Sequence, residues 1–329
     1  MTLTPASSAK IPATPSRFTH RAVGFTLAAL GAILFSGKAI VVKFTYEYGV
    51  DAVTLIAFRM LFSLPFFAVI ALDQARRARR GQLPVLTMSE RARVVVLGLL
   101  GYYLSSFLDF LGLRYISVGL ERLILFLSPT LVLLITAFWL KRPIARRQWV
   151  ALGLSYAGVV LVFAHDLSQS RSDAIWLGAG FVFGSALTYA VYLIGSGELV
   201  KRVGSTRLTA YAMTVSSIAC LIQFFVLHPV SGLLQPMGFY GLSIIHATIN
   251  TVLPVFMIMA AVSRIGAPLA AQLGMLGPVS VLFLAYWFLG EPVTSWQLAG
   301  TGLVLAGVFA LTGGRRAPLK EAKTGSASA

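Results

Sequence analysis

Residues 116–159 read ISVGLERLILFLSPTLVLLITAFWLKRPIARRQWVALGLSYAGV, and residues 265–308 read IGAPLAAQLGMLGPVSVLFLAYWFLGEPVTSWQLAGTGLVLAGV. The two stretches align without a gap at an offset of 149 residues. Pro129 aligns with Pro278, and Pro143 aligns with Pro292. A repeat of this length in a very apolar chain predicts a membrane protein built from two homologous halves. The number of spans in each half decides whether the halves are parallel or inverted.

The composition of the 329-residue chain excludes a fold in water. Hydrophobic residues make up 57% of it and charged residues only 12%, against about 25% charged in soluble domains. The net charge of +16 comes from cations in the short gaps between apolar stretches, which is the pattern of membrane loops and not of a nucleic-acid-binding surface. The one cysteine, Cys220, lies in an apolar stretch, and no Cys/His spacing suits zinc. We therefore expect no nucleic-acid partner, no metal and no cofactor.

The apolar stretches are long enough to cross a bilayer core of about 30 Å, which needs roughly 20 residues per helix. The expected spans are 22–43, 52–72, 93–113, 117–139, 147–164, 175–196, 207–227, 237–261, 267–289 and 296–313. Every second connection is rich in lysine and arginine, and the others carry few cations. By the positive-inside rule the cation-rich side, which includes both termini, is cytoplasmic. Each half contains five spans, an odd number, so the halves are inverted relative to one another.

These spans define the expected fold class and domain organisation. The chain is predicted to be an all-α polytopic membrane protein with ten transmembrane helices arranged as two inverted five-helix repeats. The repeats cover 21–165 and 172–313, between a disordered cytoplasmic tail over 1–20 and a basic cytoplasmic tail over 314–329. The expected location is the inner (plasma) membrane of a bacterium, with the lipid bilayer as partner.

Several short motifs recur in order along the membrane portion of the chain. They are Phe35-Ser36-Gly37, Arg59, Leu127-Ser128-Pro129-Thr130, Leu276-Gly277-Pro278-Val279 and Phe288-Leu289-Gly290-Glu291-Pro292. With ten spans and the inverted repeat, they make the chain resemble the drug/metabolite transporter superfamily, in particular its EamA-type branch. The chain departs from the family pattern at Phe35-Ser36, where a Trp-Gly pair is usual, and at Lys141-Arg142, where Gly-Glu is expected. The resemblance implies a transporter of amino acids or related metabolites, by export or exchange, and not an enzyme.

Four ionisable residues fall inside the predicted spans, where each costs roughly 2.5–3.5 kcal/mol on insertion scales. Counting the rise per residue places all four at a similar depth in the outer part of the membrane. They are Lys38, Arg59, Asp109 and Glu121. One interpretation is a structural ion-pair network, and Arg59 is assigned to such a network or to a gate. The other is that Lys38, Asp109 and Glu121 line the path and meet a zwitterionic solute or exchange a proton as coupling ion. Arg122, next to Glu121, is expected to extend to the membrane surface.

Polar residues at helical spacing predict three further faces of a central path. The polar candidates are Tyr102, Ser105, Tyr189, Tyr192, Asn250 and Gln272. Pro129, Pro254 and Pro278 are the expected helix breaks, because proline removes a backbone donor. Glycines in helices 5 and 10 favour close packing, which assigns those helices to the scaffold or to a homodimer contact.

The sequence therefore predicts alternating-access transport of a small organic solute. Exchange of sugar phosphates or nucleotide sugars stays open as an alternative, with the charge of the path as the discriminator. Two rivals come from other classes. One is a passive channel, although apolar stretches lie at both mouths of the predicted path. The other is a membrane-embedded enzyme, for which His246 with Asn250 is too small a constellation. No GxxxxGK[ST] loop is present, so direct use of ATP is not expected.

Overall fold

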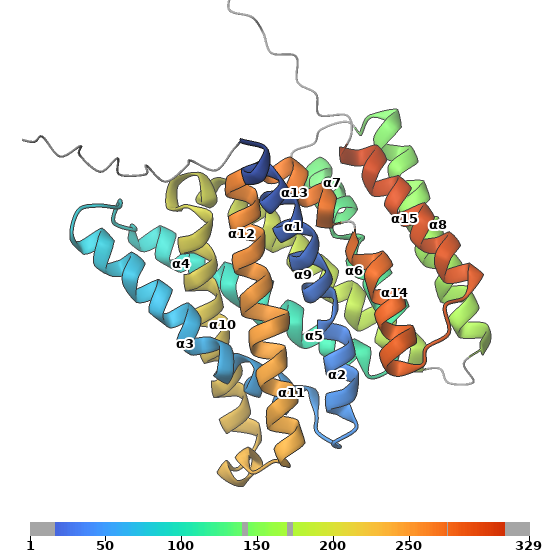
Figure 1. Ribbon diagram of the computed structural model, residues 1–329, viewed down its shortest axis with the longest axis horizontal. Coiled ribbons are helices and arrows are strands. Elements are labelled where there is room, and N and C mark those ends of the chain that lie inside the picture. The colour runs from blue at the N-terminus through green and yellow to red at the C-terminus, as the bar shows by residue number, and fades with distance from the viewer. Residues whose placement is uncertain (1–16, 140–143, 170–173, 275, 313–329) are drawn as a thin grey trace, which may run out of the picture.

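The computed structural model describes residues 17–139, 144–169, 174–274 and 276–312, and the regular elements in these ranges are all helices (Figure 1). The first half contains α1 (Arg17–Ser36), α2 (Lys38–Tyr46), α3 (Ala52–Arg79), α4 (Met88–Gly98), η1 (Leu99–Leu104), α5 (Ser105–Leu113), α6 (Val118–Leu125), α7 (Ser128–Trp139) and α8 (Arg146–Gln169). The second half contains α9 (Ala174–Val203), α10 (Ser205–Leu227), η2 (Val230–Leu233), α11 (Met237–Ala247), η3 (Thr248–Val252), α12 (Leu253–Ile265), α13 (Ala267–Gly274), α14 (Leu276–Leu289) and α15 (Ser295–Thr312).

These helices form the ten membrane spans. Eight segments are long and apolar enough to cross a bilayer, and the shorter apolar helices Leu276–Leu289 and Ser295–Ala310 belong to the ninth and tenth spans. The all-α polytopic fold class is therefore confirmed. Residues 1–16 and 313–329, which include most of the predicted tails, lie outside the described residues, as do Lys141, Arg142, Pro143, Arg171 and Asp173.

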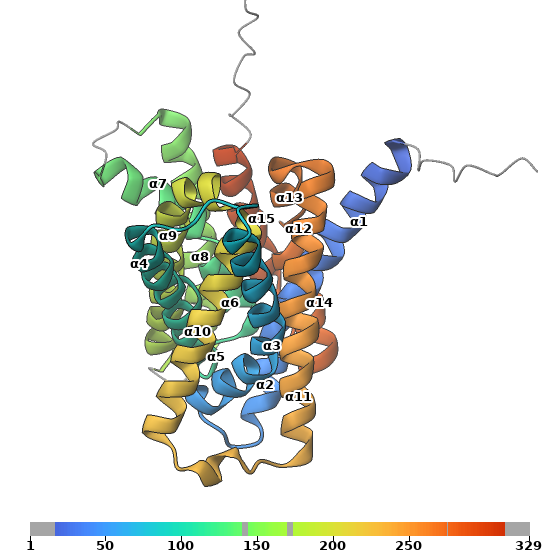
Figure 2. The same ribbon diagram turned by 90° about the vertical axis from the view of Figure 1, so that its left-hand side faces the viewer.

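The start of α1 and the end of α15 lie on the same side of the molecule, at the top of Figures 1 and 2. We call this side the basic side, because the end of α3, which carries several arginines, and the end of α9, which carries Lys201 and Arg202, are also there. The other side, where α2 meets α3 and α14 meets α15, is called the far side. Successive spans run from one side to the other.

The packing of α8 on α15 shows that the two halves are inverted. A side chain at Gly158 would lie 2.5 Å from the Gly300 carbonyl oxygen, and one at Gly307 would lie 2.7 Å from the Ala151 carbonyl oxygen. Adding the repeat offset of 149 converts 158 into 307 and 151 into 300. The repeat thus exchanges the two contacts with one another. This is what a pseudo-two-fold axis between two antiparallel helices requires. Glycine permits this approach because it has no side chain.

Interruptions in the helices follow the same repeat. The third span contains the π-helix η1 (Leu99–Leu104), and the eighth contains the π-helix η3 (Thr248–Val252), which begins 149 residues later. The fourth span is interrupted after Leu125 and resumes as α7 at Ser128. The interruption of the first span at Gly37 has no such partner, since α9, the first helix of the second half, is continuous from Ala174 to Val203. The first span is thus the asymmetric element.

Candidate functional site

The break between α1 and α2 brings a lysine into the interior. Gly37 separates the helices, and Lys38 is the first residue of α2 and is 9% exposed. Two backbone carbonyls at the break are bound by side chains from distant helices: Asn250 Nδ2 donates to Leu34 O at 2.6 Å, and Arg122 Nη2 donates to Ser36 O at 3.1 Å. A break inside a membrane helix persists only when other groups satisfy the freed backbone atoms. The break is therefore stabilised by side chains of other helices, which bind its free carbonyl oxygens.

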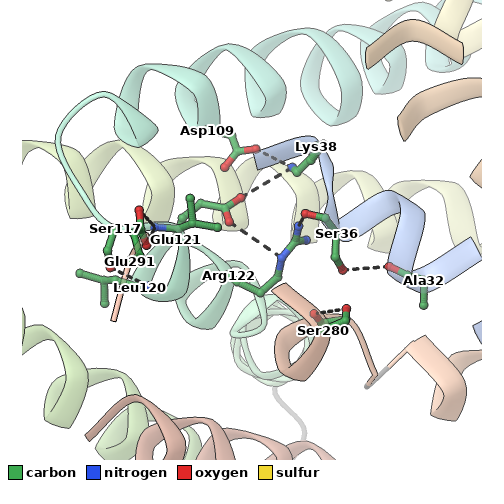
Figure 3. Close-up of polar contacts among 12 residues, drawn as sticks. Ala32, Ser36, Lys38, Asp109, Ser117, Leu120, Glu121, Arg122, Ser280 and Glu291 are labelled. Atoms are coloured by element: carbon green, nitrogen blue, oxygen red, sulfur yellow. Dashed lines mark hydrogen bonds and ion pairs between the residues drawn. The ribbon is translucent and has the colours of Figure 1, made fainter. Parts of the chain in front are cut away.

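Lys38 is the centre of a buried ion cluster made of Lys38, Asp109, Glu121 and Arg122 (Figure 3). Lys38 Nζ lies 2.6 Å from Asp109 Oδ2 and 3.8 Å from Glu121 Oε1, and Arg122 Nε lies 3.9 Å from Glu121 Oε2. Glu121 has no exposed surface. The groups come from α2, α5 and α6, and two cations balance two carboxylates. The structure thus joins three of the four residues expected at a common depth and adds Arg122.

The expected position of Arg122 at the membrane surface is wrong. Its side chain is buried, with 4% of the residue exposed, and it binds the Ser36 carbonyl as well as approaching Glu121. Consecutive helix residues point about 100° apart, which favours separate environments for Glu121 and Arg122. The length of the arginine side chain overcomes this angle, because the break at Gly37 offers a free carbonyl oxygen to its guanidinium.

Arg59 lies apart from the ion cluster. Its guanidinium is 4.9 Å from the centre of the Phe110 ring, and among the described residues no carboxylate lies within 4.0 Å of it. His246 is close to the same ring, with 5.4 Å between ring centres. Arg59 Nε and His246 Nε2 are both buried without a hydrogen-bond partner among the described residues. Phe110 follows Asp109 in α5, so the two groups of buried charges are neighbours.

Several polar atoms of the ion cluster and of the neighbouring Asn250 have no hydrogen-bond partner in the part of the chain that the structure describes. They are Asp109 Oδ1, Glu121 Oε1 and Oε2, Arg122 Nε and Asn250 Oδ1. More than about 90% of buried polar groups in proteins are paired, so such a concentration needs an explanation. Acceptors and donors of opposite charge at one place can bind a ligand that carries both an ammonium and a carboxylate.

The other predicted path residues form a second polar group between η1, α5 and α9. Tyr102 and Tyr192 hydroxyls lie 3.2 Å apart, and the Ser105 and Ser185 hydroxyls lie 3.0 Å apart. Tyr189 stacks on Tyr192 with 5.6 Å between ring centres. This second group shares α5 with the ion cluster, since Ser105 lies one turn before Asp109.

Two of the three predicted helix breaks, Pro129 and Pro254, lie at helix interruptions. Pro129 is the second residue of α7, Pro254 is the second residue of α12 directly after η3, and Pro278 is the third residue of α14. Gln272 belongs to α13, and its side chain lies outside the described residues. Among the glycines of the fifth and tenth spans, Gly158, Gly300 and Gly307 lie in the contact between α8 and α15. A methyl group added at Gly153 or Gly302 would meet no described atom within 4 Å.

On the far side, hydrogen bonds join the start of α6 to Asp166 and Glu291, and the sequence did not predict these contacts. Ser117 Oγ donates to Asp166 Oδ2 at 2.7 Å and accepts from the amide of Leu120, and the Val118 amide donates to the Glu291 carboxylate at 3.2 Å. Burial raises the pKa of Glu291 and outweighs the opposing effect of the Lys43 ammonium. One signal is present in the sequence, because Ser117 is a good N-cap residue for α6. Hydropathy alone places Glu291 and Asp166 in loops and does not indicate that they meet.

Comparison with known proteins gives this arrangement a family. The model of the EamA-like transporter family matches residues 22–164 and 176–313, which is most of the chain. A Bacillus subtilis protein named uncharacterized transporter YcbK is 29% identical over 313 residues, covering 94% of this chain and 97% of its own. The B. subtilis uncharacterized transporter YyaM is 26% identical over 71% of this chain and 77% of its own.

Relatives and folds extend beyond that organism. An uncharacterized transporter from Archaeoglobus fulgidus is 24% identical over 82% of this chain and 91% of its own. A solved crystal structure has the same fold, with a TM-score of 0.57 and 17% identity over 90% of this chain and 97% of that chain. Ten spans, two inverted repeats and family matches over both repeats lead to one conclusion. The chain belongs to the EamA-like transporter family and is a multi-pass membrane transporter.

Proposed function

We propose that the transporter exports or exchanges an amino acid or a related zwitterionic metabolite, and that the ion cluster is its binding site. The observation that carries this proposal is the balanced, buried set of two cations and two carboxylates with free hydrogen-bonding atoms. The ammonium of a zwitterion would meet Asp109 and Glu121, and its carboxylate would meet Lys38 and Arg122. Charge-assisted hydrogen bonds of this kind are roughly twice as strong as neutral ones.

Alternating access is supported by where the helices are interrupted. The π-helices η1 and η3 occupy equivalent positions in the two repeats, and the fourth span has a further break before Pro129. Interrupted helices at the interface of inverted repeats suit a fixed site around which one half moves against the other. Tyr102, Tyr192 and Asn250 would then line the path next to the ion cluster. The basic side would face the cytoplasm of a bacterium, by the positive-inside rule.

We also propose the proton as coupling ion, bound at Glu121. Lys38 faces Glu121 from α2, Asp109 faces it from α5, and Arg122 adjoins it within α6. Lys43, farther along α2, donates to Ile116 O instead. A carboxylate that loses its cation inside the membrane binds a proton more readily. Movement of Lys38 toward a solute carboxylate would therefore favour protonation of Glu121.

A second candidate is exchange of sugar phosphates or nucleotide sugars, and it is favoured by Arg59. This buried arginine has no carboxylate within 4.0 Å among the described residues, so the interior of the first repeat holds one more cation than the ion cluster needs. An anionic phosphate would use that excess. A zwitterion would not need it.

Counterflow in proteoliposomes tests these proposals. Vesicles loaded with unlabelled amino acids or sugar phosphates are exposed to labelled ones, with and without a proton gradient. We expect saturable amino-acid counterflow and a loss of about tenfold or more in Lys38→Gln, because charge-assisted bonds are lost. Lys43→Gln, on the same helix but outside the ion cluster, serves as control.

Each outcome has a distinct meaning. Glu121→Gln should weaken counterflow, because one partner of the solute ammonium is lost, and the counterflow that remains should not respond to the proton gradient. Counterflow of sugar phosphates alone would replace the first proposal by the second. Flux that does not saturate would indicate a channel and contradict both. An equal loss of counterflow in Lys38→Gln and Lys43→Gln would show that the ion cluster is not the binding site.

A further inference from the structure

A groove on the basic side is separate from the proposed solute path. It has a volume of about 390 Å³ and lies between the end of α3, the start of α4 and the start of α10. Leu86 and Val94 line it on one face and pack into the hydrophobic cluster around Tyr192 on the other. A packed apolar wall therefore stands between the groove and the Tyr102–Tyr192 pair.

Three arginines line the groove, and none has an acidic partner among the described residues. Arg79, Arg91 and Arg207 converge on it from α3, α4 and α10, and no carboxylate of the described ranges lies within 4.0 Å of their guanidinium groups. The nearby carboxylates are engaged elsewhere: Asp73 pairs with Arg77 at 2.8 Å, and Glu90 pairs with Arg202 at 2.9 Å. Three like charges without counter-charges attract an anion.

Arg207 makes this more than a surface cluster of arginines. Only 3% of the residue is exposed. Its Nη1 donates to Pro84 O at 2.7 Å, its Nε donates to the Tyr211 hydroxyl at 3.4 Å, and its guanidinium lies 5.5 Å from the centre of the Tyr211 ring. The side chain is thus held in one orientation before any ligand arrives. Arginine presents a planar fork of donors that matches a phosphate.

The rest of the groove is lined mainly by apolar side chains of membrane-spanning helices. Val95, which is 41% exposed, and Val215 continue the lining away from the arginines along α4 and α10. Both helices belong to membrane spans. A ligand that fits both parts carries a phosphate at one end and a hydrocarbon chain at the other.

We infer that this groove binds the headgroup of an anionic phospholipid from the leaflet on the basic side, with the phosphodiester on Arg79, Arg91 and Arg207 and an acyl chain along Val95 and Val215. Basic recesses between membrane helices on the cation-rich side are suited to such lipids, and each arginine near a charged surface contributes about 1 kcal/mol, or about fivefold. The site does not depend on which solute the protein moves.

Lipid retention by the purified full-length protein tests the inference. Native mass spectrometry would compare binding of phosphatidylglycerol and phosphatidylcholine with identical chains. We expect preferential retention of phosphatidylglycerol, weakened at least about tenfold in the double variant Arg79→Gln/Arg91→Gln. Both residues are exposed, so the fold does not depend on them. The control Arg76→Gln/Arg93→Gln removes the same charge from exposed positions outside the groove.

Three results would overturn the inference. They are equal retention of the two lipids, equal loss in the two double variants, and displacement of phosphatidylglycerol by soluble glycerol 3-phosphate at matching concentration. The last would show that the groove takes a free phosphate monoester and needs no acyl chain. Glycerol 3-phosphate that fails to compete, together with loss confined to the groove variant, supports the lipid site.

Discussion

Gly37 determines where Lys38 lies, because it is the residue at which the first span breaks. A methyl group at this position would lie 2.8 Å from Asn250 Nδ2 and 3.3 Å from Leu34 O. Asn250 would have to move, and its 2.6 Å hydrogen bond to Leu34 O would be lost. That bond holds the break open on one side, as the bond from Arg122 to Ser36 O does on the other. The backbone of Gly37 is helical, with φ at −62°, so its conformation does not require glycine. The close approach of Asn250 does.

We expect Gly37→Ala to reduce counterflow by about tenfold while costing about 1 kcal/mol of stability, the net value of one hydrogen bond. Counterflow and thermal unfolding of the purified protein measure the two effects. Gly180→Ala is the matched control, because it also lies inside a long membrane helix and has nothing within 4 Å of the added methyl group among the described residues. Equal activity in the two variants would show that the break does not position the ion cluster.

Glu291 gives a prediction about pH. Burial raises the pKa of this carboxyl group in the folded protein above its ordinary value near 4.5. The folded state therefore holds the proton at pH values where the unfolded chain has released it, and the contribution of Glu291 to stability falls as pH rises through this range. Glu291→Gln does not titrate at this position. Relative to it, the wild-type protein should gain stability as pH is lowered from 8 toward 5, a range of about three pH units in which shifted carboxyl groups titrate.

Thermal unfolding of both proteins across that pH range provides the measurement. Glu47→Gln, an exposed carboxylate on the same side, controls for the general effect of removing a negative charge. A stability difference that is constant with pH, or that moves in favour of Glu291→Gln as pH falls, would contradict the burial of Glu291 against Val118 and Lys43.

At the scale of elements, α8 and α15 are equivalent helices of the two repeats, and their backbones approach closely at glycines. Gly158 meets the Gly300 backbone, whereas Gly153, on the same helix, has no described atom within 4 Å of an added methyl group. Valine at 158 would force the helices apart, and overpacking typically costs about 1–3 kcal/mol. We expect Gly158→Val to lower thermal stability by that amount and Gly153→Val to leave it unchanged or slightly raised. A cost at 153 alone would indicate that α8 presents its other face to a neighbour, such as a second copy of the chain.

The elements also show what the sequence could and could not predict. The ten spans follow from hydropathy, and the start of α4 at Met88, earlier than expected, is signalled by Thr87 and Glu90, which form a capping box. The π-helices have no such signal. Neither the sequence of Leu99–Leu104 nor that of Thr248–Val252 distinguishes a π-helix from an α-helix, because the two differ only in backbone register. In the folded chain η1 contacts α9 and η3 contacts α1, and hydropathy indicates neither contact.

The same distinction applies to the site. Lys38, Asp109 and Glu121 were predictable because buried charges in a membrane are costly and must meet. The pairing of Arg122 with Ser36 O was not, because it needs a helix break at Gly37 that hydropathy does not reveal. Arg59 shares their depth along the span, but rotation of α3 places it on Phe110 instead. Depth can be counted from the sequence, whereas rotation about a helix axis is set by packing.

At the scale of the whole molecule, the protein is symmetric in its scaffold and asymmetric in its chemistry. The pseudo-two-fold axis relates the α8–α15 contacts and the π-helices of the third and eighth spans. Within the described ranges, the break at Gly37 and the ion cluster occur in the first repeat only. A symmetric scaffold can exchange the conformations of its two halves, and an asymmetric site then meets the solute from either side at one fixed place.

Ser36 offers the most direct test of that account. It lies at the break beside the ion cluster, is 2% exposed, and is close in size to cysteine, while the native Cys220 is fully buried and serves as an internal control. Ser36→Cys in oriented proteoliposomes would be treated with a membrane-impermeant thiol reagent added to one side at a time. Alternating access predicts slow modification from either side, suppressed by the transported solute, with Cys220 unmodified. Modification from one side only, or from neither under conditions that support counterflow, would contradict it.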